Sequence, residues 1–446
     1  MPDSGGEIYM GVIMRLGKAA GMALLGLFLL TLTMLQRAEA SSTIEQDYLC
    51  AWLSLASYDD RIGEIARNEL VAAGWEMAQF EEKNRKADAH YYLVRQDQPG
   101  GKAQYMLSIM GTSSWKDIEN DLSLSKVPFA GTTPEEFAKE AARKEMSAEE
   151  PLVHEGFNNY MHTAFFTERI NGWTVGEMLR DELLAHPASR ICITGHSLGG
   201  AVSVLLAARL VDMGVPSEQI DVVTFGAPAV GNDAFAKKFG NLNIRRVTMS
   251  GDPVKAILQS LCAGYTQIGE KLELKPPKGT ERFPHAMTGY VDGMLRQYYD
   301  TEPADYTLAS GLKPRVFFVA GAGLDEAVAG DAPYLCRAAA QLLYRQIPGL
   351  VVGTEVPDTF YGIANAAKAK GCKYAIVQHY ETERKRTSRG YYDFNVTLTE
   401  TVLDTKGNVL SVQAMTTSTD RMPVVLAGIY NSVAGREMRD AALGIK

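Results

Sequence analysis

A serine stands between glycines in the segment ITGHSLGGA (193–201), where an apolar run rich in β-branched residues passes into a helical pattern. The spacing Gly195-x-Ser197-x-Gly199 at such a junction is typical of a nucleophile elbow, a sharp turn that leaves the serine hydroxyl exposed at the carboxyl edge of a sheet. Glycines suit the flanking positions because strand and helix must approach closely there. The helix N-terminus favours negative charge that develops nearby. Taken alone the pattern is weak evidence, because a helix that starts with a serine cap has the same letters.

An alcohol at its ordinary pKa is a poor nucleophile, so the elbow predicts a histidine base and an acid later in the chain, in the order Ser, Asp, His. Two histidines follow Ser197, and His285 in FPHAMTGYV is favoured because His379 lies in a region that we assign to a second domain. Asp252 comes directly after a strand-like run in VTMSGDPV and is the favoured acid. Asp233 is the alternative acid, although a turn or a helix cap explains it better.

Acyl transfer also needs N–H donors for the oxyanion. The backbone N–H of Leu198 is the first candidate, and Thr112, at the start of a loop after an early strand, is the second. Thr112 is also suited to cap the helix that follows, and one residue can fill both roles. An apolar stripe on the same loop either covers the pocket in water as a lid or packs permanently on the core. It consists of Trp115, Ile118 and Leu122.

The elements that must hold these residues alternate between strands and helices. Helical patterns occupy residues 44–74 and 198–214. Alternation of apolar strands with amphipathic helices predicts an α/β fold with a mostly parallel sheet covered on both faces. The strand-like runs stand at 90–96, 103–110, 190–195, 220–226 and 244–250.

Several segments, in this order, resemble the class 3 lipases, which are secreted lipases and esterases of the α/β-hydrolase fold. The resemblance covers about residues 45–295 and implies that Ser197 is the nucleophile, Asp252 the acid and His285 the base. It further implies that Thr112 and Leu198 form the oxyanion pair. The matching segments are GTSSWKDIENDL (111–122), VHEGF (153–157), ITGHSLGGA (193–201), VVTFGAPAVGN (222–232) and DPV (252–254).

Two features depart from the family pattern. The oxyanion loop of these lipases usually continues with Asp-Trp, whereas this chain has Asp117-Ile118. A charged segment at 134–150, which we expect to form a solvated helix, is inserted before VHEGF. The resemblance also implies that His154 of VHEGF is a structural residue and not a second base.

The composition changes after about residue 300. Residues 301–314 are typical of a linker, and residues 315–446 predict a second, smaller α/β domain with a mixed sheet, including a long hairpin and a terminal helix from about 424. The charged run 381–390 predicts a loop. Gly321 and Gly323 follow a strand, but the third glycine of a dinucleotide site is replaced by Glu326, which excludes that reading. The role of this domain stays open.

The amino terminus predicts export. Arg15 and Lys18 precede an apolar run at 19–35, and Ala38-Glu39-Ala40 has the small-x-small pattern of a processing site. We therefore expect a signal peptide over residues 1–40 that is removed after Ala40. An uncleaved membrane anchor is the alternative, because the run is at the short limit for crossing a bilayer. In either case residues 41–300, the predicted hydrolase domain, lie outside the cytoplasm, secreted, periplasmic or anchored.

The net charge bears on possible binding partners, and the cysteine content bears on disulfide bonds. The net charge of −8 argues against nucleic acid, since phosphate binding requires a basic surface. Five cysteines are too few for a dense disulfide framework. Cys336 and Cys372 are the pair that we would test first for a bridge, with free buried thiols as the alternative.

Together these observations predict a serine hydrolase of carboxylic esters, a lipase, esterase or phospholipase, with lipid or ester substrates that include those at a membrane or lipid interface. Neither a metal nor an organic cofactor is required by this chemistry. The alternative is an extracytoplasmic binding or assembly protein that acts through residues 315–446 and retains a vestigial hydrolase.

Overall fold

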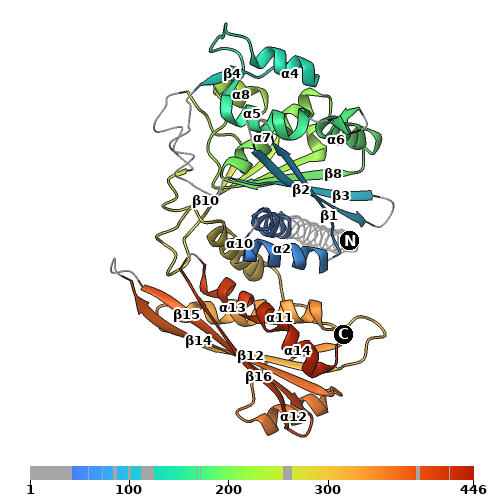
Figure 1. Ribbon diagram of the computed structural model, residues 1–446, viewed down its shortest axis with the longest axis vertical. Coiled ribbons are helices and arrows are strands. Elements are labelled where there is room, and N and C mark those ends of the chain that lie inside the picture. The colour runs from blue at the N-terminus through green and yellow to red at the C-terminus, as the bar shows by residue number, and fades with distance from the viewer. Residues whose placement is uncertain are drawn as a thin grey trace, which may run out of the picture.

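The computed structural model places two β-sheets one above the other with helices between them (Figure 1). The amino-terminal part of the described chain builds the first sheet, and the part after residue 315 builds the second. The structure describes residues 43–58, 60–72, 74–83, 88–98, 102–111, 125–167, 169–170, 172–254, 264–387, 392–420 and 422–445.

The first sheet has seven strands, and four of its six pairings are parallel. The second strand in spatial order is antiparallel to the first and to the third, and every later strand is parallel to its neighbour. The predicted α/β fold with a mostly parallel sheet is therefore confirmed. In spatial order the strands are β1 (Glu76–Lys83), β2 (Asp88–Gln98), β3 (Lys102–Ile109), β8 (Arg190–His196), β9 (Ile220–Phe225), β10 (Asn243–Met249) and β11 (Glu270–Leu274).

Helices cover both faces of this sheet (Figure 1). On one face α7 (Leu198–Asp212) is buried along almost its whole length, as its run of Ala, Val and Leu residues requires. Beside it lie α4 (Pro134–Ala141), α5 (Glu155–Phe166), α6 (Val175–Ala185) and α8 (Asp233–Lys238), with the strand pairs β4 (Lys126–Pro128) with β5 (Leu152–His154) and β6 (Arg169–Ile170) with β7 (Trp173–Thr174). On the other face lie the helix at residues 43–56, α2 (Arg61–Ala72) and α10 (Met287–Thr301).

The second sheet is mixed, in the order β13 (Leu350–Val352), β12 (Val316–Gly323), β14 (Tyr374–Arg386), β15 (Tyr392–Asp404) and β16 (Val409–Ser418). One face packs on α11 (Ala332–Gln346), α13 (Val424–Ala434) and α14 (Arg436–Leu443), and the other packs on α12 (Phe360–Ala369). The predicted mixed sheet and hairpin are present, and the single terminal helix predicted from about 424 is divided at Gly435 into α13 and α14.

Three local expectations differ from the structure. The run 381–390 was expected to be a loop, but β14 continues to Arg386, because cross-strand bonds to β15 hold a segment whose two faces are both largely in water. The charged segment 134–150 is helical only to Ala141. Cys336 and Cys372 are free thiols, since α11 carries Cys336 on one face of the second sheet whereas Cys372 packs with α12 on the opposite face.

The two sheets share the layer of helices that lies between them. One apolar cluster contains buried residues of both sheets and of the helices between them, from Tyr48 near the start of the described chain to Leu443 near its end. Tyr48 stacks on Tyr298 of α10, with ring centroids 4.6 Å apart. Arg296 of α10 pairs at once with Asp292 and with Asp331, which directly precedes α11. The domain limits at 301–314 remain a prediction.

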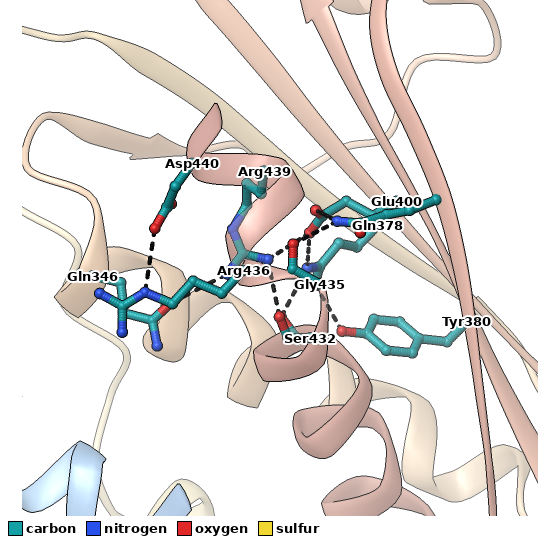
Figure 2. Close-up of polar contacts among 10 residues, drawn as sticks. Gln346, Gln378, Tyr380, Glu400, Ser432, Gly435, Arg436, Arg439 and Asp440 are labelled. Carbon is teal, nitrogen blue, oxygen red and sulfur yellow. Dashed lines mark hydrogen bonds and ion pairs between the residues drawn. The ribbon is translucent and has the colours of Figure 1, made fainter. Parts of the chain in front are cut away.

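A buried ion pair fastens α14 to the second sheet (Figure 2). Glu400 of β15 and Arg439 of α14 both have side chains that are 0% exposed, and their closest N···O distance is 2.8 Å. Gln378 donates to Glu400, and Tyr380 donates to Gln378. Since burial of an unpaired charge is costly, this network holds α14 in one place.

Hydropathy adds one finding on helices. Within the ranges that the structure describes, none is both long and apolar enough to cross a membrane. The apolar run 19–35 and the predicted processing site lie outside those ranges.

Candidate active site

Ser197 occupies a strained turn between β8 and α7. Its φ is 57° and its ψ is −123°, and no other non-glycine residue in the described ranges has a positive φ. Such a conformation is costly for a side chain with a Cβ and is found mainly at functional positions. A Cβ on Gly195 would clash with the backbone of Gly199, and one on Gly199 would clash with Ile109 of β3. The glycines are therefore needed for the close approach that the spacing predicted.

Three side chains from separate parts of the chain meet at this turn. Ser197 Oγ lies 2.9 Å from His285 Nε2, and His285 Nδ1 lies 2.8 Å from Asp252 Oδ2. A carboxylate only accepts, so Nδ1 carries the proton and the Nε2 lone pair faces the serine hydroxyl. The structure thus brings together the three residues that the sequence singled out, in the geometry of a nucleophile, a base and an orienting acid.

Three donors bind the Asp252 carboxylate, which lies just beyond the end of β10. It is 2% exposed, and its Oδ1 accepts from the Val254 N–H at 2.8 Å. The Tyr290 hydroxyl donates to Asp252 Oδ2 at 2.5 Å and accepts from the Met249 N–H at 3.1 Å. Burial, with the adjacent carboxylate, raises the pKa of Tyr290 well above 10, so its hydroxyl stays protonated. Sequence reasoning missed Tyr290, since only tertiary packing brings α10 under the acid.

A second histidine steadies the first. His196 Nε2 lies 2.8 Å from the carbonyl oxygen of His285, which can only accept, so Nε2 is the protonated nitrogen. Its Nδ1 then accepts from the Tyr58 hydroxyl at 2.6 Å. Burial lowers the pKa of His196 well below 6.5, with the proximity of His285 as a second cause, so His196 stays neutral. This neutral ring fixes the backbone of His285 without competing for its proton.

The hydroxyl is less accessible than the sequence led us to expect. Ser197 is 1% exposed, whereas the His285 side chain is 19% exposed. The elbow therefore aims Oγ at His285 and leaves the serine almost wholly covered. Leu198 begins α7 directly after the serine, so its N–H is one of the first in the helix and has no intrahelical acceptor.

The remaining sequence candidates have separate outcomes. Thr112 and the lid candidates Trp115, Ile118 and Leu122 lie outside the described residues, so their roles stay predictions. Asp233 is at the first turn of α8 and accepts from Thr266. His154 caps α5 through Nδ1, in keeping with a structural role. In the described part of the chain, no group of three His, Cys, Asp or Glu side chains is gathered as a metal site would need.

Comparison with known proteins identifies part of the chain. A family model described as Lipase (class 3) matches residues 106–260, which include Ser197 and Asp252 and end before His285. Phospholipase A1-II 1 of rice (Oryza sativa subsp. indica) is 28% identical over 211 residues, which are 44% of this chain and 50% of that protein. Secreted mono- and diacylglycerol lipase 1 of Fusarium solani is 44% identical over 83 residues, 18% of this chain and 24% of that protein.

Among solved structures, a Rhizomucor miehei lipase propeptide complex aligns with a TM-score of 0.40 and 20% identity, covering 52% of this chain and 67% of that one. The chain spans about half the length of the rice relative. The family match therefore applies to a part of the molecule, and residues 106–260 form a class 3 lipase domain.

Proposed function

We propose that this protein hydrolyses carboxylic esters of lipids, with Ser197 as nucleophile, His285 as general base and Asp252 as the acid that orients it. The observation that carries the proposal is the chain of two hydrogen bonds, at 2.9 and 2.8 Å, that joins the three side chains at a strained turn. The family of residues 106–260 supports lipid esters as the substrate class.

The proposed reaction proceeds in two halves. His285 Nε2 takes the proton of Ser197 as Oγ attacks the ester carbonyl, and then returns it to the leaving alcohol, which gives an acyl-serine. Water, deprotonated by the same nitrogen, attacks the acyl-serine; the bond from the acyl carbon to Oγ then breaks, the acid leaves, and Nε2 returns the proton to Ser197 Oγ. Asp252 stays ionised and stabilises the imidazolium in both halves. The N–H of Leu198 at the start of α7 supplies one donor to the oxyanion, and Thr112 is the proposed second.

A fluorophosphonate probe tests the nucleophile directly, because it phosphonylates only an activated serine. We expect one covalent adduct per chain on wild-type protein, none on Ser197→Ala, and strongly slowed labelling of His285→Ala. Ser203, which lies on α7 and donates to the Gly199 carbonyl, gives a matched control as Ser203→Ala. Absence of labelling in well-folded wild-type protein would favour the alternative of a binding protein with a vestigial hydrolase.

Substrate preference requires a second experiment. Esters of increasing acyl length, measured below and above their solubility limits, separate an esterase from a lipase that works at an interface. Ser197 is 1% exposed. We therefore expect turnover to rise when the substrate forms an interface that favours a conformation with a more exposed Ser197 hydroxyl. Parallel assays with a triacylglycerol and a phospholipid separate the lipase from the phospholipase reading.

We further propose that the protein is exported and processed after Ala40, on the strength of the pattern in residues 15–40. Amino-terminal sequencing of the mature protein should begin at Ser41. Retention of residues 1–40 in the membrane fraction would instead support the uncleaved anchor.

A further inference from the structure

The loop that carries His285 leans on the second sheet as well as on the first. It runs from residue 275 to 286, between β11 and α10, and descends toward β15 in Figure 1. We propose that the second sheet positions the proposed base, with Arg282 and Asp393 as positioning residues. This inference rests on the proposed function and gives residues 315–446 a part in it.

Backbone hydrogen bonds within the loop join residues that are close in sequence. Phe283 donates to the Thr280 carbonyl at 2.8 Å, and Ala286 donates to the Phe283 carbonyl at 2.9 Å. These bonds make consecutive turns, but a chain of turns does not fix the direction in which the loop extends. Contacts with other elements must therefore fix it.

One such contact is an ion pair. Arg282 Nη2 donates to Asp393 Oδ1 of β15, and the two side chains are 16% and 13% exposed. At that burial the pair is partly shielded from solvent and salt, unlike an ion pair on an open surface. Asp420, at 3.9 Å from Arg282 and 73% exposed, adds a weaker charge on the same side. The guanidinium is thus held over the first residues of β15.

Apolar packing reinforces this contact. Gly279 lies against Phe394, such that a Cβ on the glycine would be 3.4 Å from the ring. Phe394 is 2% exposed. Its backbone N–H donates to the Thr419 hydroxyl at 2.8 Å, and its carbonyl accepts from the Thr419 N–H at 2.8 Å. The part of β15 that meets the loop is held by β14, which pairs with β15 from Tyr392 to Asp404, and by Thr419, whereas β16 pairs with β15 only from Asn395 to Leu403.

The position of His285 follows from both supports. His196 holds the His285 carbonyl from the first sheet, and Arg282, three residues earlier, is held by the second sheet. Displacement of the loop by an ångström would lengthen the 2.9 Å contact between Nε2 and Ser197 Oγ beyond hydrogen-bonding range. Errors of this size reduce turnover strongly even when the chemistry is intact.

The test uses the full chain with Asp393→Asn, Arg282→Gln and the charge-reversed pair Arg282→Asp with Asp393→Arg. We expect each single variant to lower kcat on a soluble ester and the fluorophosphonate labelling rate by about tenfold, with KM changed less than about twofold. The charge-reversed pair should recover part of the loss, and hydrogen exchange in residues 277–286 should be faster in the single variants. Arg436→Gln is the matched control, because it removes the exposed Arg436–Asp440 pair of α14, which also lies within residues 315–446.

The outcomes separate the two proposals. If wild-type protein labels and Asp393→Asn, shown to be folded, labels at the wild-type rate with unchanged exchange in the loop, the positioning proposal is wrong and the hydrolase proposal stands. If wild-type protein neither labels nor hydrolyses esters, both are wrong. An equal loss of rate in Arg436→Gln would show a general effect of destabilising residues 315–446, and it would also overturn the proposal.

Discussion

Replacing Asp252 by asparagine tests the proposed mechanism most sharply, because each oxygen of this carboxylate has an assigned donor. Oδ1 accepts from the Val254 N–H, whereas Oδ2 accepts from His285 Nδ1 and from the Tyr290 hydroxyl. The asparagine must place an NH₂ group at one of these positions, where it faces a donor. Both orientations are therefore unfavourable, for different reasons.

If the NH₂ group replaces Oδ2, it donates to His285 Nδ1 and forces the proton onto Nε2, which then points at Ser197 and cannot accept its proton. If the NH₂ group replaces Oδ1, the tautomer is preserved, but the Val254 N–H loses its acceptor at a cost of about 1–3 kcal/mol. The imidazolium also loses its counter-charge in both cases. We therefore expect kcat to fall by about 10³–10⁴-fold, which corresponds to about 4–5.5 kcal/mol in the activation free energy.

The assay is kcat on a soluble chromogenic ester, with the fluorophosphonate labelling rate as a second measure. Asp221→Asn is the matched control, because Asp221 is also a buried aspartate of the same sheet but bonds to Arg190 at the opposite edge. It should retain wild-type turnover. Retention of kcat within about tenfold of wild type in folded Asp252→Asn would refute the assignment of this acid.

The remaining predictions concern partners of the triad and of the second sheet. Tyr290→Phe should lower the free energy of unfolding by about 1–3 kcal/mol in denaturant titrations, because the buried Met249 N–H loses its acceptor. In wild-type protein, His196 should make the free energy of unfolding fall as the pH decreases below 6.5, by up to about 1.4 kcal/mol per pH unit, since the unfolded chain binds a proton there and the folded chain does not. His196→Gln should remove that part of the slope. Glu400→Gln should lower the free energy of unfolding by about 3 kcal/mol, because Arg439 stays buried without a counter-charge, and exposed Glu437→Gln should not.

Two residues of the proposed triad could be predicted because each has a local signature. Ser197 lies in a spaced glycine pattern, and Asp252 lies in a turn at the end of a strand. His285 was found by elimination among two histidines. Strand ends of a parallel sheet meet at one edge, so the order of the strands was sufficient to bring these segments together.

Other features have no such signature. The hydroxyl of Tyr58 meets His196, and the hydroxyl of Tyr290 meets Asp252, only after helices that are distant in sequence have packed on the first sheet. The burial of Ser197 depends on the whole surrounding structure and not on the elbow. Residues 381–386 alternate poorly because much of that strand is in water on both faces, so the rule of apolar and polar alternation fails there.

The helices between the sheets connect the first sheet to the second. An amphipathic pattern states that a helix has an apolar face, but not which sheet covers it. Here α10 contributes Tyr290 to the acid on one side, and on the other it receives Arg337 of α11, which donates to the Tyr299 carbonyl at 2.6 Å. The same helix follows the loop of His285 and Arg282. Contacts made by residues 315–446 therefore connect to Asp252 and to His285 through one helix and one loop.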